Sequence, residues 1–143
     1  MLKIYPDADK EVVLLGVWLH DIGILVNGLD TDHAVTGEVE TKRFLKEIGA
    51  NNNLIEKVSH CVRAHRNRDI SPRTLEAKIV AVSDSASHML EPVYVDIACR
   101  GELEEGVSKL ERDYRDIKLL PEVQTQMQPL YLAWKHLLEI YPK

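Results

Sequence analysis

The chain has 143 residues, of which 45% are hydrophobic and 29% are charged, and its formal net charge at pH 7 is -5. These values fit one domain, residues 1–143, with a sizeable apolar core. The acidic balance argues against an extended nucleic acid as partner, which usually requires a basic surface. The longest strongly apolar run, Val12–Leu19, is far shorter than the roughly 20 residues of a membrane span, so no membrane partner is expected.

The spacing of apolar residues and of capping residues predicts an all-α fold, a helical bundle without paired strands. Asp32 is expected to cap the second helix and Gly49 to end it. In chain order, the predicted helices run from Asp7 or Asp9 to about Asn27, from Asp32 to Ile48, from Asn51–Asn53 to about Arg66, from Pro72 to Leu90, over Val93–Arg100, over Glu102–Leu119, and from Pro121 to Tyr141.

The cysteine content is low. Cys61 and Cys99 cannot form a disulfide framework, and both fall in apolar helical patterns. We therefore expect two buried free thiols in a cytoplasmic protein without a signal peptide.

His20 and Asp21 end the most hydrophobic segment of the chain, and apolar residues continue after them at positions 22 and 24–26. A carboxylate in such a setting is costly to bury unless it is paired or bound to a metal ion. The dipeptide alone leaves two interpretations open. It is either a metal-binding pair, or a local cap or salt bridge beside a core histidine.

The third predicted helix carries Leu54, Val58, Cys61 and His65 at i, i+4, i+7 and i+11. This spacing forms one apolar stripe, so His65 is predicted to face the core. His60 falls on the polar side and is predicted to be solvated. The alternative for His65 is that the stripe ends at the surface.

The second predicted helix places His33, Gly37, Phe44 and Ile48 on one face. Because His33 lies in the first turn, it can face inward from the rim of a cavity. The alternative is a surface histidine beside a helix cap.

The fourth predicted helix places Ala77, Val80, Asp84 and His88 on one face. Asp84 follows four apolar residues and has small neighbours, which favours a buried ligand over a surface charge. His88 is expected at the rim, and a contact with Asp84 is the alternative.

Three predicted helices thus offer inward His or Asp residues, and a fourth offers His33. Imidazole and carboxylate together suit Zn, Mn, Fe, Ni or Co better than Ca, and water-containing coordination also admits Mg. The sequence therefore predicts a divalent metal cofactor without selecting one.

Basic residues between the third and fourth predicted helices suggest an anionic ligand. Four arginines gather there, namely Arg63, Arg66, Arg68 and Arg73. Arginine pairs with phosphate oxygens through two parallel hydrogen bonds. Arg66 and Arg68 are predicted to bind a phosphorylated substrate, and Lys78 is placed to reach the same cavity. The alternative is a solvated loop whose arginines pair with Asp69 and Glu76.

Four segments resemble the HD-domain metal-dependent phosphohydrolases, in the order expected for that family. Residues 18–23, Trp-Leu-His-Asp-Ile-Gly, are similar to its signature. His33–Gly37 is similar to its His-x-x-x-Gly helix start, and His65 stands where many members have a histidine closing a helix. Leu75–Asp84 resembles the helix that ends in the last Asp ligand. The resemblance extends from residue 1 to about residue 90.

The resemblance implies an HD-domain-like bundle around one or two metal ions, with His20, Asp21 and Asp84 as ligands of the first. It implies that His33 and His65 serve a second metal or contact substrate phosphate. The expected activity is hydrolysis of a phosphomonoester or nucleotide by a metal-activated water. Asp21 is expected to be a bridging ligand or a base for the water. His65 is expected to be the second catalytic residue and, with His33, to bind a second ion or neutralise the phosphate.

One departure from the family pattern concerns a further histidine ligand upstream of the His-Asp pair. No His precedes His20. We expect the natural protein to begin further upstream, with water or a second copy in a homo-oligomer filling the gap here. Replacement by His33 or His88 is the alternative. The rival functions are a non-catalytic HD-like module that binds a nucleotide or metal, and a dinuclear iron oxygenase.

Overall fold

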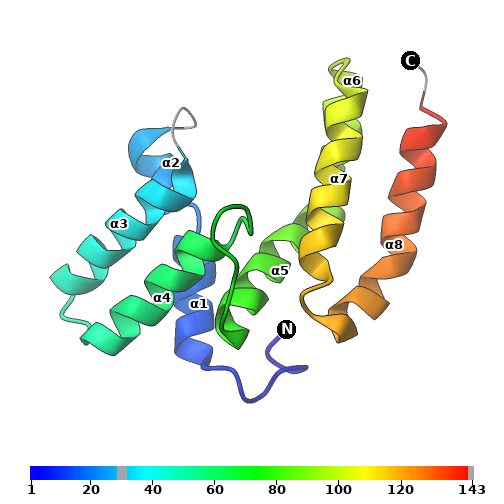
Figure 1. The fold of residues 1–143 in the computed structure, drawn as a ribbon. Helices are drawn as coiled ribbons and strands as arrows, with labels where there is room; N and C mark the ends of the chain where they lie inside the picture. The colour runs from blue at the N-terminus through cyan, green and yellow to red at the C-terminus, as the bar shows by residue number, and fades with distance from the viewer. Residues whose placement is uncertain (29–31, 142–143) are drawn as a thin grey trace. The chain divides into compact units, whose positions relative to one another are not determined.

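The structure is a computed structural model that describes residues 1–28 and 32–141. The described residues form helices and no strands, so the predicted all-α fold is confirmed (Figure 1). The helices are α1 (Lys10–Leu19), α2 (Ile22–Asn27), α3 (His33–Glu47), α4 (Asn52–Ala64), α5 (Leu75–Met89), α6 (Val93–Cys99), α7 (Leu103–Ile117) and α8 (Pro121–Glu139). None of them is long and apolar enough to cross a membrane.

The chain divides into two compact units, Met1–Ala81 and Val82–Lys143. Helix α5 begins in the first unit and ends in the second. Each unit is described by itself below, and the single-domain expectation stays a prediction.

The predicted first helix is wrong in one respect that matters for the site. It does not continue to Asn27: α1 ends at Leu19, and α2 begins at Ile22. The apolar pattern continues on both sides of the break, so hydrophobic periodicity does not predict it. The break places the side chains of His20 and Asp21 at the junction of two short helices. The loop expected between α2 and α3 includes residues 29–31, which lie outside the described residues.

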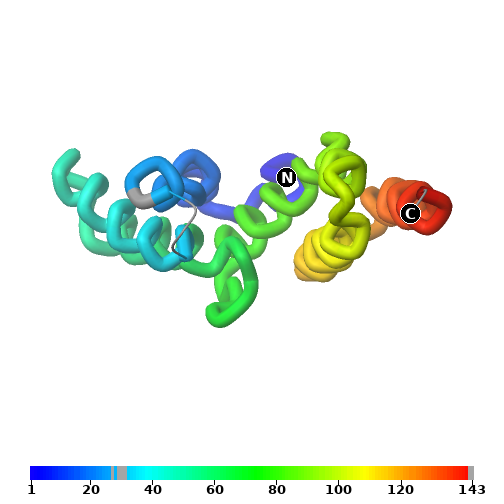
Figure 2. The backbone as a smooth tube through the Cα atoms, turned by 90° about the horizontal axis from the view of Figure 1, so that it is seen from above, coloured from blue at the N-terminus to red at the C-terminus, as the bar shows by residue number. Residues whose placement is uncertain are grey.

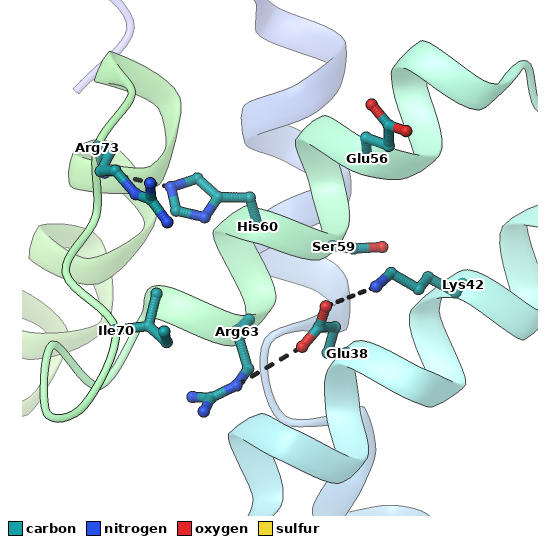
Figure 3. Close-up of a pocket in the computed structure, with 8 residues that line it drawn as sticks. All are labelled: Glu38, Lys42, Glu56, Ser59, His60, Arg63, Ile70 and Arg73. Atoms are coloured by element: carbon teal, nitrogen blue, oxygen red, sulfur yellow. Dashed lines mark hydrogen bonds and ion pairs between the residues drawn. The ribbon is translucent and has the colours of Figure 1, made fainter.

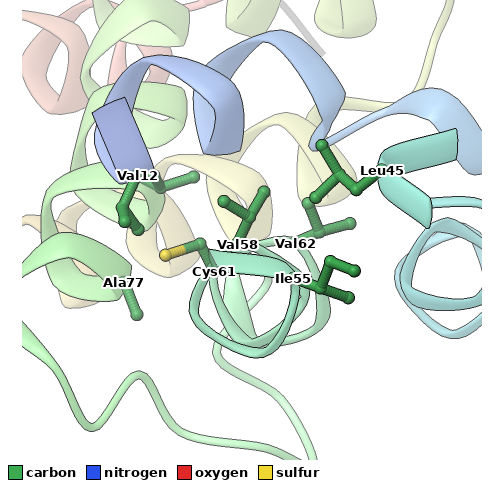
Figure 4. Close-up of a cluster of buried hydrophobic side chains, with 8 residues drawn as sticks. Val12, Leu45, Ile55, Val58, Cys61, Val62 and Ala77 are labelled. Carbon is green, nitrogen blue, oxygen red and sulfur yellow. The ribbon is translucent and has the colours of Figure 1, made fainter. Parts of the chain in front are cut away.

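The core of the first unit lies between α1, α3, α4 and the start of α5 (Figure 4). Figure 2 shows α3 and α4 side by side, and these two helices share the most extensive packing of the unit. The buried cluster consists of Val12, Leu45, Ile55, Val58, Cys61, Val62, Ala77 and Val80. Each such side chain contributes on the order of 1.5–3 kcal/mol when it is fully removed from water.

Helix α1 buries only one face, although its sequence is apolar on nearly every side. Val12, Val13 and Gly16 are buried, and Gly16 lies so close to α4 that a Cβ there would be 3.1 Å from Cys61 Cβ. On the opposite side, 84% of Trp18 is exposed. The apolar run therefore reflects one core face and one exposed apolar face.

The helix ends that carry the candidate site residues are fixed by capping. The Asp9 side chain accepts from the Val12 N–H at the start of α1, and Asp32 accepts from the Ala34 N–H at the start of α3. The Asn51 side chain accepts from the Leu54 N–H at the start of α4. Gly49, with φ +79°, ends the α3 turn in the left-handed region that favours glycine, as predicted.

Helices α2 and α3 approach closely at Gly23. A Cβ on Gly23 would collide with the backbone oxygen of His33 and would lie 2.8 Å from the Gly37 nitrogen. Both obstacles are backbone atoms, which cannot move aside as a flexible side chain can. Glycine at this position therefore lets the start of α3 lie directly against α2, beside Asp21.

The second unit contains the end of α5 with α6, α7 and α8. Its buried residues include Tyr94, Leu110, Ile117 and Leu138. The Trp134 indole nitrogen donates to the Met89 carbonyl at 2.9 Å, which ties α8 to the end of α5.

The two thiols differ from each other. Cys61 is buried as predicted, and burial raises the pKa of its thiol to about 12. The prediction for Cys99 is wrong, because this residue is exposed and its sulfur lies 2.9 Å from the Tyr141 hydroxyl.

Candidate metal centre

Three predicted site residues of the first unit converge on one point. Asp21, His33 and His65 each direct a potential ligand atom into a common cluster. His33 Nε2 lies 3.4 Å from Asp21 Oδ1 and 3.3 Å from His65 Nε2, and His65 Nε2 lies 3.8 Å from the same Asp21 oxygen. The residues come from the α1–α2 junction, the first turn of α3 and the end of α4.

Backbone carbonyls set the direction of two of the imidazole rings. His65 Nδ1 lies 2.6 Å from the Val62 carbonyl oxygen, and His20 Nδ1 lies 2.7 Å from that of Val17. Because a carbonyl oxygen only accepts, each ring carries a hydrogen on Nδ1, and Nε2 is the nitrogen that faces Asp21. This is the arrangement that orients histidine ligands in metal sites.

His20 lies beside the cluster and faces the second oxygen of Asp21. Its Nε2 is 3.3 Å from Asp21 Oδ2, while Asp21 Oδ1 faces His33 and His65. The His20 and His65 rings meet edge to face, with centroids 5.3 Å apart. The carboxylate of Asp21 thus lies between His20 on one side and His33 and His65 on the other, with one oxygen toward each side.

Electrostatics keep Asp21 ionised. The hydrogen bond from His20 is the largest influence and lowers the pKa of Asp21, with further lowering from the charges of His65 and His33. Partial burial of the carboxylate opposes this shift without reversing it. An anionic carboxylate beside several imidazole nitrogens is chemically suited to hold a cation.

The separations between these donor atoms fit a transition-metal ion. Donors about 2.1 Å from one tetrahedrally coordinated ion stand about 3.4 Å from one another. The distances among Asp21, His33 and His65, 3.3 to 3.8 Å, are close to that value. His65 is almost fully buried, so its contacts with Asp21 and His33 are shielded from water.

The remaining predicted ligand, Asp84, lies on α5 in the second unit. It is partly buried, and its Oδ1 lies 3.7 Å from His88 Nε2. Its role as a ligand together with His20 and Asp21 stays a prediction from the sequence.

The predicted substrate-binding residues have mixed surroundings. Arg66 forms an ion pair with Asp32 at 3.0 Å, at the cap of α3 and next to His33. Arg68 is exposed, and Lys78 is partly buried on α5. Their contact with a substrate stays a prediction.

The stripe predicted for α3 is correct at its start and wrong at its end. Gly37 is buried and His33 reaches the cluster, but Phe44 and Ile48 are exposed. The face turned to the core is that of Ala34, Gly37, Thr41 and Leu45. On α4, by contrast, the whole predicted stripe from Leu54 to His65 packs inward.

A second polar feature of the first unit was not foreseen. It is a cavity of about 250 Å³ lined by Glu38, Lys42, Glu56, Ser59, His60, Arg63, Ile70 and Arg73 (Figure 3). The signal was available, since four of these residues recur on α4 at i, i+3, i+4 and i+7 from Glu56. Several charged residues that line this cavity form ion pairs. Arg63 contacts Asp69 and Glu38, and Lys42 contacts Glu38 at 2.6 Å.

His60 lies at the edge of this cavity and is half-buried rather than solvated. Its Nε2 accepts from the Arg73 N–H at 3.2 Å. Burial and the nearby Arg73 charge lower the pKa of His60, so the ring is neutral near pH 7. Its accepting nitrogen is therefore already engaged.

Residues 1–89 match the HD domain family, and the chain belongs to that family. Ribonuclease Y of Fusobacterium nucleatum subsp. nucleatum is 36% identical over 81 residues, which are 56% of this chain and 14% of that relative. The chain thus matches only a small part of the length of this curated relative. No solved structure matches the chain.

Proposed function

We propose that the protein is a metal-dependent phosphohydrolase that acts on a phosphomonoester or a nucleotide. The observation that carries this proposal is the convergence of Asp21, His33 and His65 at distances suited to a divalent ion. Membership of the HD domain family supports it, because that family is typically associated with metal-dependent phosphohydrolysis.

The proposed ligand sets share Asp21. If two divalent ions bind, Asp21, His33 and His65 would hold one of them, and Asp21 and His20, with Asp84 as the sequence predicts, would hold the other. Bound divalent ions polarise phosphoryl oxygens and lower the pKa of water. Asp21 would serve either as the ligand shared by the ions or as the base for the attacking water, and its lowered pKa keeps it ionised for either role.

Two rings oriented by backbone carbonyls hold the geometry. The carbonyls of Val62 and Val17 fix the rings of His65 and His20, so little reorganisation is needed at the time of reaction. Arg66, Arg68 and Lys78 are proposed to bind the anionic substrate. Arg66 forms an ion pair with Asp32, the N-cap residue of α3, and can exchange that partner for a phosphate oxygen.

A second candidate is cleavage of phosphodiester bonds in RNA. The observation in its favour is the similarity to a protein named Ribonuclease Y over 81 residues, which lie in the part of the chain matched by the HD family. The acidic net charge of -5 weighs against a long nucleic-acid substrate. Short oligoribonucleotides therefore belong in the same substrate panel.

The test is a screen of phosphomonoesters, nucleotides and short RNA with Mn²⁺, Co²⁺, Zn²⁺, Ni²⁺, Fe²⁺ and Mg²⁺ added singly. We expect turnover with at least one metal, and a loss of at least about 100-fold in Asp21→Asn. The matched control is Asp7→Asn, because Asp7 is an exposed carboxylate of the same unit. Full activity in Asp21→Asn would remove Asp21 from the mechanism, and metal binding without any turnover would favour a regulatory module.

A further inference from the structure

The cavity of about 250 Å³ in the first unit has charges of both signs in its wall, and some of them are paired with one another. Glu38 contacts both Lys42 and Arg63, and Arg63 also contacts Asp69. Two cations thus face two carboxylates, so this part of the wall is electrically balanced. The volume lies a little below the range of about 300–1,000 Å³ that is typical of small-molecule sites, which suits a ligand of the size of a small metabolite.

Two further charged side chains line the cavity and form no ion pair with a described residue. They are Arg73, in the segment before α5, and Glu56, on α4. Figure 3 shows them on either side of His60. Glu56 precedes His60 by one helical turn, and the Arg73 backbone N–H donates to the His60 ring at 3.2 Å. One cation and one anion are therefore near the same imidazole, within reach of one small molecule.

His60 adds a hydrogen-bond donor between these two charges. Its Nε2 accepts from the Arg73 backbone, and burial together with the Arg73 charge lowers the pKa of the ring below its usual value. A neutral imidazole whose Nε2 accepts carries its hydrogen on Nδ1. Within the part of the chain that the structure describes, this Nδ1–H has no hydrogen-bond partner.

Ser59 is a buried polar group in the wall of the same cavity. Only 1% of the residue is exposed, and its hydroxyl makes no hydrogen bond to any described residue. A buried hydroxyl is costly to leave unsatisfied, and in native proteins such groups are usually satisfied by protein, water or a ligand. Thr41 on α3 is also buried with an unsatisfied hydroxyl, but it is not part of the cavity wall. It therefore serves as an internal comparison.

We propose that this cavity binds a small zwitterion of the amino acid class, with its carboxylate at Arg73, His60 and Ser59 and its ammonium group at Glu56. The Arg73 guanidinium pairs with a carboxylate, and the His60 and Ser59 hydrogens donate to its oxygens. A simple anion would meet the uncompensated charge of Glu56, and a simple cation would meet that of Arg73. A ligand with both charges satisfies both residues. The site uses none of the residues of the candidate metal centre, so it is independent of the proposed function.

The experiment is a ¹H–¹⁵N NMR titration of the full chain with the protein amino acids added singly, and with acetate and methylammonium as the two half-ligands. We expect at least one amino acid to cause saturable shifts at the amides of Ser59, His60 and Arg73. Arg73→Gln and Glu56→Gln should each raise its dissociation constant by at least about 10-fold, because each removes one of the two charge contacts. Arg43→Gln is the control, since Arg43 is an exposed cation of α3 outside the cavity.

Ser59→Ala separates a binding role from a structural one. It removes an unsatisfied hydroxyl, so the melting temperature should stay the same or rise, while the amino acid should bind about 3–10-fold more weakly. Thr41→Val removes the comparable hydroxyl outside the cavity and should change neither the melting temperature nor the affinity by much. A loss of affinity in Ser59→Ala without a loss of stability is the result expected of a ligand contact.

Three results would overturn the proposal. One is the absence of saturable shifts at the cavity amides with every amino acid. Another is unchanged affinity in both Arg73→Gln and Ser59→Ala. The third is acetate binding as tight as that of the amino acid, with stronger binding in Glu56→Gln, since this would make the cavity a site for simple anions. Asp21→Asn should bind the amino acid as the wild type does, so a failure of the proposed metal-dependent activity leaves this test unaffected.

Discussion

The two faces of α4 carry the same residue type in opposite settings. On the inner face, His65 follows Val58 and Cys61, is 2% exposed, and presents Nε2 to Asp21. On the outer face, His60 uses its Nε2 to accept from the Arg73 backbone. The comparison teaches that the lone pair, rather than the residue type, marks a candidate ligand. In His65 a carbonyl engages Nδ1, and Nε2 faces Asp21 and His33.

The largest effect that tests this comparison is expected at His65. Replacing it in His65→Gln removes an oriented imidazole from the cluster, and we expect metal affinity and turnover to fall by at least about 100-fold. His60→Gln is the matched control on the same helix and should change both by less than about threefold. Metal content by elemental analysis and steady-state kinetics measure the two effects. Equal losses in both variants would contradict the distinction between the two faces.

A second large effect is expected at Gly23, which sets the distance between α2 and α3. In Gly23→Ala the new methyl group meets the backbone of His33 and Gly37, and we expect a loss of about 1–3 kcal/mol in the free energy of unfolding. Asp21 and His33 should also separate, so metal affinity should fall.

The graded comparison is Gly37→Ala, whose Cβ would meet a Val62 methyl group at 3.0 Å. A side-chain methyl can yield, so this variant should lose less stability than Gly23→Ala. Chemical denaturation gives both free energies. The reverse order of stabilities would show that the close approach at Gly23 does not set the geometry of the site.

The contrast between the two faces of α4 was readable from the sequence, because a stripe at i, i+4, i+7 and i+11 has one inner side. The caps at Asp32 and Asn51 were also readable, since short polar side chains satisfy the first N–H groups of a helix. The break between α1 and α2 was not, because apolar residues continue on both sides of Asp21. Propensity and periodicity do not register a two-residue interruption that tertiary packing stabilises.

The partners of individual charges were harder to predict than the helices. The alternative in which an arginine of this region pairs with Asp69 is confirmed for Arg63, although the Arg63 side chain is only 15% exposed rather than solvated. Pairing with Glu76 is not supported, since Glu76 accepts from the Asp9 backbone. Such pairs depend on distances of a few ångströms between segments remote in sequence. The relation of Asp84 to His20 depends on two units at once, and it stays a prediction.

A moderate effect is expected at Arg66, the cation nearest to the cluster in sequence. Arg66→Ala should raise KM for a phosphorylated substrate by about 3–10-fold with little change in kcat, because it removes a ground-state contact with the anion. Arg68→Ala should act in the same direction. The control is Arg43→Ala, which removes an exposed ion pair with Glu40 on α3. Unchanged KM in both Arg66→Ala and Arg68→Ala would assign the loop a solvated role only.

The smallest effect concerns the outer-face pair of Arg63 and Asp69. Hydrogen bonding from Arg63 lowers the pKa of Asp69 to about 2. A carboxyl whose pKa is lowered by folding stabilises the folded state above its unfolded pKa of about 3.9 and loses that contribution as the pH falls toward 2. Because Asp69 is exposed, solvent screening keeps its contribution to stability small. In Arg63→Gln, a carboxyl-carbon NMR titration should show the pKa of Asp69 returning toward about 3.8. Arg73→Gln should leave it low, because the bond comes from Arg63. An ordinary Asp69 pKa in the wild type would mean that Arg63 does not hold this carboxylate and is available to an anionic ligand. Arg63 on the outer face of α4 and Arg66 beside the cluster would then no longer differ in function.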